Sequence, residues 1–265
     1  AKRAVLLLTA GGLLMTLMVE LIVLQGDIGR MNTVFKFYFQ AWVLLGLSAA
    51  MALVWLWPAV VRLWSAAWRN SWRVVFGILL FSAALFPLLG GADKIRDRMA
   101  PDAPHVLDGM AYMDYATYSD QGAVMDLSED AAAIRWMQEN VQGSPVIVEG
   151  NTPEYRWGSR FTIYTGLPGV VGWNWHQRQQ RNLVPSNWVT DRIDDIARFY
   201  TTTDAQEAQA FLQKYHVSYI IVGQLEHIYY PGPGLDKFEA LDGQLWQKVY
   251  QNAGTVIYRV RGSQG

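Results

Sequence analysis

The stretch VLLLTAGGLLMTLMVELIVL, residues Val5–Leu24, is a continuous apolar run interrupted by one charged side chain, Glu20. Two further apolar runs follow, Ala41–Val61 and Val74–Leu89. A transmembrane helix needs about 20 predominantly apolar residues to cross ~30 Å of hydrocarbon. Each run reaches or nearly reaches that length, so the sequence predicts three transmembrane helices, at about 4–24, 41–61 and 73–91.

The composition changes abruptly after Gly91 to that of a charged, soluble domain. Residues 92–127 contain Pro101 and Pro104 and are expected to form a linker. Residues 128–265 alternate helical and strand patterns, which is typical of an α/β domain. The predicted fold class is therefore a membrane protein with α-helical transmembrane segments followed by a soluble α/β domain.

The start of the sequence suggests a longer protein. Ala1, Lys2 and Arg3 lead directly into the first apolar run, without an initiator Met or the cleavage site of a signal peptide. Three helices also make a poor bundle on their own. We expect missing N-terminal spans, or other membrane subunits, to accompany this part.

The overall charge and the cysteine content exclude several functions. The formal net charge is −1, which offers no basic surface for nucleic acid. The chain has no Cys, so disulfides, thiolate catalysis and Cys-ligated metal centres are excluded. Lys and Arg residues divide evenly between the two sides of the membrane, so charge bias does not fix the orientation. With three spans, however, the first loop and the C-terminal domain lie on the same side.

The segment between the first two runs combines polar and aromatic residues. Gly26 and Gly29 interrupt the helical pattern, and 25–40 is predicted to be an interfacial loop carrying Arg30 and Lys36. Glu20 has two interpretations, a functional intramembrane acid or a side chain that reaches the headgroups.

The soluble part predicts a specific order of elements. A helix begins at Ser128, a buried strand covers Pro145–Glu149, and a short strand covers Gly169–Gly172. Two amphipathic helices, a second buried strand and a hairpin follow, at Asp191–Tyr200, Asp204–His216 (with Asp204 as the N-cap), Ser218–Val222, Trp246–Tyr250 and Thr255–Val260.

A polar loop rich in rings and guanidinium groups follows the strand Pro145–Glu149. In open α/β sheets, ligands bind beyond the carboxyl ends of the strands. Aromatic rings stack on sugars, and Arg binds phosphate through two hydrogen bonds. The candidate residues are Glu149 and His176 as catalytic groups, Arg30, Lys36, Arg160, Arg178 and Arg181 as phosphate ligands, and Tyr155, Trp157, Trp173 and Trp175 as an aromatic surface.

Each candidate also has a structural interpretation. The aromatic residues Trp173 and Trp175 can serve as packing, and His176 can be a hydrogen-bonded structural residue. Arg178 and Arg181 share a helical face and can simply solvate a helix end. Glu149 is held rigidly after a buried strand, whether or not it is catalytic.

No cofactor follows from the sequence. The four His are too scattered to define a metal site by spacing. Asp27, Glu149 and His176 can nevertheless meet around a divalent metal, because both loops share a side. No Walker loop, His-Glu-x-x-His or Gly-x-Ser-x-Gly motif is present.

Four stretches resemble a known family along essentially the whole chain. They are RMNTVFKFY at Arg30–Tyr38, AIRWM at Ala133–Met137, RFTIYTGLP at Arg160–Pro168 (with Gly172, Trp173, His176 and Arg181 after it), and KYHVSYIIVG at Lys214–Gly223. These look like the C-terminal part of the "YYY" multi-spanning membrane proteins of archaea and chloroflexi, whose function is unknown.

That family in turn distantly resembles the GT-C glycosyltransferases. The resemblance implies a many-helix bundle in the cell membrane, an extracytoplasmic C-terminal domain, and transfer of a sugar from a polyprenyl-phosphate carrier. Such enzymes place a catalytic Asp in an N-terminal external loop that this sequence lacks, and Asp27 does not inherit that role. The Trp-Trp-Asp-Tyr-Gly signature of oligosaccharyltransferases is also missing, and Tyr155–Gly158 is only loosely similar.

The sequence thus leaves two main hypotheses. In the first, the chain is the C-terminal portion of a GT-C-like glycosyltransferase that uses a polyprenyl-phosphate sugar. In the second, it is a non-catalytic accessory subunit of a larger membrane complex. A lipid- or glycan-binding module is a third, weaker option.

Overall fold

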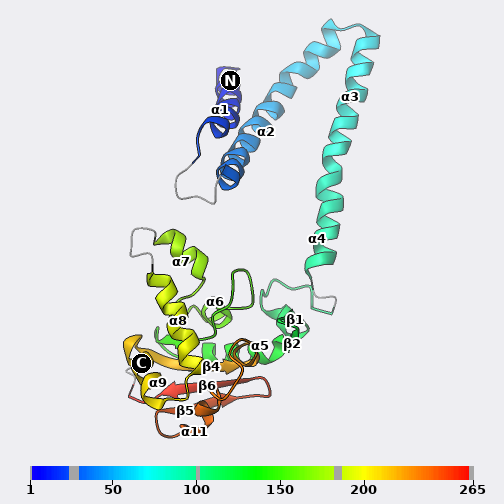
Figure 1. The fold of residues 1–265 in the computed structure, drawn as a ribbon. Helices are drawn as coiled ribbons and strands as arrows, with labels where there is room; N and C mark the ends of the chain where they lie inside the picture. The colour runs from blue at the N-terminus through cyan, green and yellow to red at the C-terminus, as the bar shows by residue number, and fades with distance from the viewer. Residues whose placement is uncertain (1, 24–29, 100–101, 182–186, 263–265) are drawn as a thin grey trace. The chain divides into compact units, whose positions relative to one another are not determined.

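The structure is a computed structural model that describes residues 2–23, 30–99, 102–181 and 187–262. The chain divides after Arg98 into two compact units, each of which is described by itself. Figure 1 shows the helical first unit and the α/β second unit along the chain. Three long apolar helices followed by a mixed α/β domain confirm the predicted fold class.

The first unit contains three helices that are long and apolar enough to cross a membrane. They are α1 (Lys2–Leu21), α2 (Arg30–Leu63) and α3 (Ala66–Leu85). A π-helical turn at Phe86–Gly90, which contains Pro87, connects α3 to α4 (Gly91–Arg98). The helical path therefore continues seven residues beyond the predicted end of the third span at residue 91.

Packing between α1 and α2 follows a seven-residue repeat. The buried residues of α1 are Val5, Gly12 and Val19. A Cβ atom at Gly12 would lie 2.8 Å from Leu45 Cγ of α2, so the absence of a side chain permits this close approach. A repeat of seven keeps one stripe of α1 against its partner, as in coiled coils.

Residues 30–40, predicted as part of an interfacial loop, are helical and continuous with α2. No Gly or Pro occurs between Arg30 and Gly46 to end the helix, and Thr33 is buried like the later Ala41. The remaining part of the predicted loop, including Gly26, Asp27 and Gly29, lies outside the described residues. Glu20, near the end of α1, forms an ion pair with Arg30.

The second unit is built on a four-stranded sheet of order β3-β4-β6-β5. β3 (Val146–Val148) pairs in parallel with β4 (Val217–Gly223), and β4 pairs antiparallel with β6 (Thr255–Val260). β5 (Trp246–Gln251) and β6 form the predicted hairpin. Every residue of β4 is buried, as expected for a strand covered on both faces.

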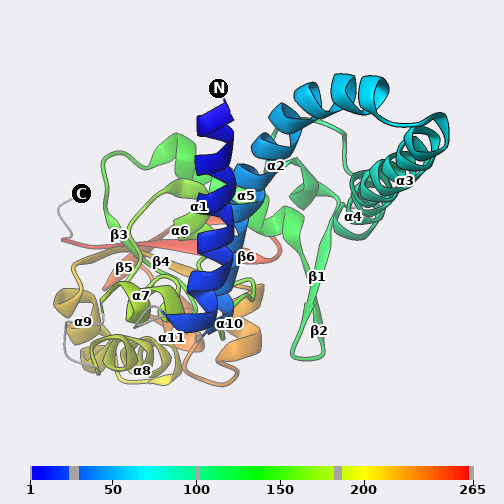
Figure 2. The same ribbon diagram turned by 90° about the horizontal axis from the view of Figure 1, so that it is seen from above.

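Helices cover both faces of this sheet, as Figure 2 shows. One core contains residues of α8 (Trp188–Thr201), α9 (Ala205–Lys214) and α11 (Asp236–Ala240). The other contains residues of α5 (Leu127–Asn140) and α6 (Arg160–Thr165). Asp204 caps α9 as predicted, accepting a hydrogen bond from the Gln206 amide at 2.7 Å.

Three local predictions need correction. The helix expected at Ser128 begins at Leu127 and is capped by Asp126, which accepts from the Ser128 amide at 2.9 Å. Gly169–Gly172 contributes one bridge, between Gly169 and Ile147, in place of a strand. Residues 92–127, expected as a linker, include most of α4, a 3₁₀ turn (Ala111–Asp114) and a hairpin of β1 (Thr117–Asp120) and β2 (Ala123–Asp126).

The remaining helices are short and follow strands or loops. α7 (Asn174–Gln180) lies between α6 and α8, and α10 (Gln224–Tyr229) follows β4 directly.

Candidate functional site

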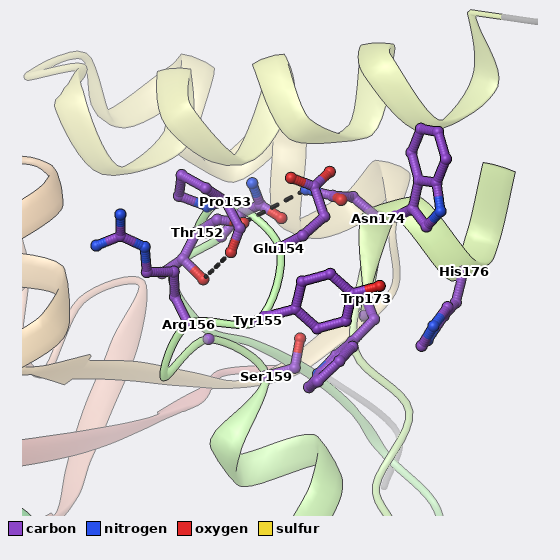
Figure 3. A pocket seen from close by; sticks show the side chains of 13 residues that line it. Thr152, Pro153, Glu154, Tyr155, Arg156, Ser159, Trp173, Asn174 and His176 are labelled. Atoms are coloured by element: carbon purple, nitrogen blue, oxygen red, sulfur yellow. Dashed lines mark hydrogen bonds between the residues drawn. The ribbon is translucent and has the colours of Figure 1, made fainter. Parts of the chain in front are cut away.

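A cavity lies beyond the carboxyl end of β3, where the sequence predicted a ligand site. Its enclosed volume is only about 20 Å³, and the hollow around it, counted with open solvent, measures about 320 Å³. Two segments form it, and Figure 3 shows the Tyr155 ring of one beside Trp173 of the other, with Arg156 extending away from them. The lining residues are Asn151, Thr152, Pro153, Glu154, Tyr155, Arg156, Gly158 and Ser159 from the loop after β3, and Gly172, Trp173, Asn174, Trp175 and His176 from the start of α7.

A buried charge cluster, formed by Arg160, Asp130, Glu149 and Glu226, fixes both ends of the loop after β3. Arg160 Nε donates to Asp130 Oδ2 at 2.6 Å, and its Nη2 donates to Glu226 Oε2 at 2.9 Å. Glu226 also accepts from the amide of Gly150, at 2.7 Å. The loop is thereby attached to α10 where it begins and to α5 and α10 where it ends.

Glu149 belongs to the same cluster. Its two oxygens accept the amides of Phe161 and Thr162 in the first turn of α6, at 3.0 and 2.9 Å. Arg160 Nη1 lies 3.7 Å from Glu149 Oε2. Both oxygens are occupied and the residue does not line the cavity, so this geometry favours a structural role over the predicted catalytic one.

Burial and charge act in opposite directions within the cluster. Burial raises the pKa of Glu149, although Arg160 and the two amides offset part of the effect. Burial also disfavours charge on Glu226, yet Arg160 and two backbone amides hold the pKa of that carboxyl below its ordinary value. Three carboxylates likewise raise the pKa of Arg160 despite burial. The cluster is thus a set of mutually dependent charges.

The predicted phosphate-binding role of Arg160 is therefore wrong. Its side chain is fully buried, and carboxylates of the protein occupy the guanidinium group. Trp157 also lies outside the cavity lining: its indole N–H donates to Asp130 at 2.8 Å, and its ring packs against Tyr118 and Tyr164. The structure thus places the Trp157 ring in packing contacts.

Three rings form an aromatic wall in the cavity. Tyr155 meets Trp173 edge to face, with ring centroids 5.7 Å apart. Trp173 stacks on the imidazole of His176 at 5.4 Å. Tyr155 is 69% exposed and adopts a positive φ of 62°, which costs energy for a side chain of this size. Of the residues predicted to form an aromatic surface, Tyr155, Trp173 and Trp175 line this cavity, together with His176.

A buried amide without a full set of partners also lines the cavity. Asn174 is 8% exposed, and its Nδ2 donates to the carbonyl oxygen of Thr152 at 3.3 Å. Its Oδ1 is buried and has no hydrogen-bond partner in the described part of the chain. Rotating the amide would point oxygen at the Thr152 carbonyl, so the acceptor orientation is fixed by this contact. A buried polar atom without a partner calls for an explanation, and a ligand that donates a hydrogen bond supplies one.

The charged residues of the lining are Glu154 and Arg156. Arg156 forms an ion pair with Asp120, whose side chain is buried and also accepts from the Tyr229 hydroxyl at 2.6 Å. The guanidinium charge is thus offset by a buried carboxylate. Within the described ranges, no Lys or Arg forms an ion pair with Glu154.

The other predicted phosphate ligands lie outside the cavity lining. Arg178 and Arg181 are exposed at the end of α7, where Arg178 contacts the Thr190 hydroxyl at 3.4 Å and Arg181 the Gln177 side chain at 2.8 Å. Arg30 and Lys36 belong to the first unit. Among the described residues there is no group of three or more His, Asp or Glu arranged to hold a metal ion, and Asp27 lies outside them.

Sequence reasoning missed several residues of this site. Asn174 stands between Trp173 and Trp175 and could have been noticed as a polar residue within an aromatic run. Asp120, Asp130 and Glu226 gave no signal, because they are distant along the chain and only the fold brings them to Arg156 and Arg160.

Comparison with known proteins gives limited matches. Residues 1–45 match a family described as "Uncharacterized membrane protein (DUF2298)". No curated protein matches the chain. Among solved structures, the C-terminal globular domain of an oligosaccharyltransferase from Archaeoglobus fulgidus is similar, with 14% identity and a TM-score of 0.33, covering 49% of this chain and 95% of that one. The protein is an integral membrane protein with three candidate spans, and it associates with the lipid bilayer.

Proposed function

We propose that this protein binds a saccharide in the cavity between the loop after β3 and α7, and that it takes part in transferring a sugar from a polyprenyl-phosphate carrier. The aromatic wall, together with the buried Asn174 oxygen that has no partner, is the observation that carries this proposal. Sugar rings offer apolar faces that stack on aromatic rings, and their hydroxyls supply the missing donor.

The spans support a lipid-linked form of the sugar. An integral membrane protein meets a carrier with a long hydrocarbon chain within the bilayer, where a water-soluble domain alone would not. Arg178 and Arg181 are the residues that we propose for the carrier phosphate, because they are exposed cations at the end of the helix that carries Asn174. Arg178 lies four residues after Asn174, which corresponds to about 6 Å along a helix axis.

His176 supplies the imidazole of the aromatic wall, and we propose it for proton transfer to or from the sugar. Its ring stacks on Trp173, which fixes the plane of the imidazole while its edge stays accessible. A side chain held in one orientation is what acid–base catalysis requires. The C-terminal domain is proposed to lie on the extracytoplasmic side.

The test follows the loss of sugar from radiolabelled polyprenyl phosphates that carry glucose, mannose or N-acetylglucosamine. The full chain is reconstituted in lipid vesicles, and water serves as the sugar acceptor, so that the reaction measured is hydrolysis. We expect the double variant Arg178→Gln/Arg181→Gln to lose at least tenfold in rate, corresponding to about 1.4 kcal/mol. Arg198→Gln, which removes an exposed cation from α8, is the matched control and should leave the rate unchanged.

Equal rates for the wild type and the double variant, or no loss of sugar from any carrier, would refute the proposed part in sugar transfer. The exposure of α3 supports a second candidate in that case. None of its residues is buried, so lipid or other spans must cover every side of it. An accessory subunit that packs α3 against a larger membrane complex would then be the better description.

A further inference from the structure

The charges of the cavity lining distinguish between classes of saccharide. The titratable side chains that line it are Glu154, Tyr155, Arg156 and His176. Among these, Glu154 is the acidic and Arg156 the strongly basic side chain. The balance between these two charges therefore decides which ligand the cavity favours.

Arg156 contributes little net positive charge. Its guanidinium pairs with Asp120, whose side chain is completely buried and forms no other ion pair among the described residues. The Tyr229 hydroxyl donates to the second oxygen of Asp120 at 2.6 Å and holds it in place. A ligand that drew Arg156 away would leave a buried carboxylate without its counter-charge, which is costly. An anion would therefore compete with Asp120 for Arg156.

Glu154 contributes a net negative charge. It lies next to the aromatic Tyr155 in the sequence, lines the cavity and is exposed, without an ion-pair partner among the described residues. The Asn174 oxygen adds a second acceptor that must receive a hydrogen bond. Among the lining groups, Glu154 and the Asn174 oxygen are acceptors, and they favour a ligand that carries donors.

The aromatic wall agrees with this selection. Rings attract cations through their negative faces, and a Trp is the strongest of the aromatic side chains in this respect. Tyr155 is 69% exposed, so its ring is accessible to a ligand, while Trp173 packs against it edge to face. An ammonium group on a sugar ring would be attracted both by the aromatic rings and by the Glu154 carboxylate.

We infer that the cavity takes a neutral or amino saccharide, preferring an amino sugar with a free ammonium group, and that it discriminates against acidic saccharides such as uronic acids. This inference rests on the proposed saccharide binding and specifies its substrate class. It assigns Glu154 as the residue that determines charge specificity. The carrier phosphate would then be bound elsewhere, at Arg178 and Arg181, so the cavity itself needs no cation.

The experiment compares three soluble probes that share one ring shape: methyl glucoside, glucosamine and glucuronate. Each is titrated at neutral pH into the full chain in nanodiscs, and binding is measured by saturation-transfer NMR. Because Glu154 is exposed, we expect a modest effect: glucosamine should bind roughly two- to fivefold more tightly than methyl glucoside, and glucuronate should bind more weakly by a similar factor. Raising the salt concentration should reduce both differences.

Glu154→Gln keeps the size and shape of the side chain and removes its charge. In this variant the three probes should bind within a factor of about 1.5 of each other. Glu139→Gln, which removes an exposed carboxylate from α5 outside the cavity, is the matched control and should retain the preference of the wild type.

The outcomes separate this inference from the proposed function. Binding of methyl glucoside with no preference between glucosamine and glucuronate overturns the inference and leaves saccharide binding intact. A preference for glucuronate, or a preference that survives in Glu154→Gln, also overturns it. If none of the three probes binds to the wild type, both the inference and the proposed function fail.

Discussion

The charge cluster around Arg160 gives the sharpest prediction about stability. The substitution Arg160→Met removes the guanidinium and leaves Asp130 and Glu226, both fully buried, without a counter-charge. Removing one partner of a buried ion pair costs about 3–5 kcal/mol, because the remaining charge stays desolvated. The hydrogen bonds at 2.6 and 2.9 Å indicate that this pairing is close, so the upper part of that range applies.

Hydrogen exchange followed by mass spectrometry is the appropriate assay, since it reads the α/β unit separately from the transmembrane helices. Peptides that cover β4 should exchange faster by about three powers of ten or slightly more in Arg160→Met, because each 1.4 kcal/mol corresponds to about a factor of ten. The matched control is Arg135→Met. Arg135 pairs with Asp114 at 2.7 Å, but these side chains are 39% and 40% exposed, so we expect a loss of at most about 1 kcal/mol.

A second variant tests the cause of the effect. Adding Glu226→Gln to Arg160→Met neutralises one of the two carboxylates that have lost their counter-charge. The double variant should therefore recover part of the lost protection from hydrogen exchange. The reasoning is refuted if Arg160→Met exchanges no faster than Arg135→Met, or if the double variant is less protected than Arg160→Met alone.

Three further predictions concern other parts of the molecule. Gly12→Ile should lower the thermal unfolding temperature of the chain in nanodiscs, because its Cβ would lie 2.8 Å from a side chain of α2; Gly46→Ile, which meets nothing within 4 Å, should not. Burial would raise the pKa of Asp195, but hydrogen bonds from Lys214 and Tyr215 outweigh it and lower the pKa. The carboxylate therefore stabilises the fold above about pH 4, and this stabilisation is lost as the pH falls through the lowered pKa. Urea midpoints measured against pH should show a shallower acid dependence in Asp195→Asn, and an unchanged slope would contradict this. Asp120→Asn should release Arg156 and increase glucuronate binding in the NMR titration, and unchanged binding would argue against the neutralised pair.

The elements that could be predicted are those whose signal is local in the sequence. The three apolar runs required only hydropathy and length, and β4 only a continuous apolar stretch bounded by Gly223. The Asp204 cap and the hairpin followed from residues adjacent to those elements. Predictions from such patterns hold because these elements depend on neighbouring residues and not on partners distant in the sequence.

Predictions that depended on distant partners were the ones that failed. A guanidinium in a polar loop looks the same in the sequence whether it binds phosphate or three carboxylates of its own chain, and Arg160 proved to be the second case. Residues 30–40 look irregular because they mix aromatic and charged side chains, yet packing of Thr33 and Ala41 stabilises a helix there. The aromatic wall was accessible to sequence reasoning, whereas the buried oxygen of Asn174 required the structure.

The most direct measurement of the central claim is saturation transfer from the protein to methyl glucoside, with the full chain in nanodiscs. We expect transfer in the wild type and its loss in Trp173→Leu, which removes the central ring of the aromatic wall. Trp68→Leu, which removes an exposed ring from α3, should retain it. Transfer that persists unchanged in Trp173→Leu, or none in the wild type, would contradict the assignment of this cavity as a saccharide-binding site.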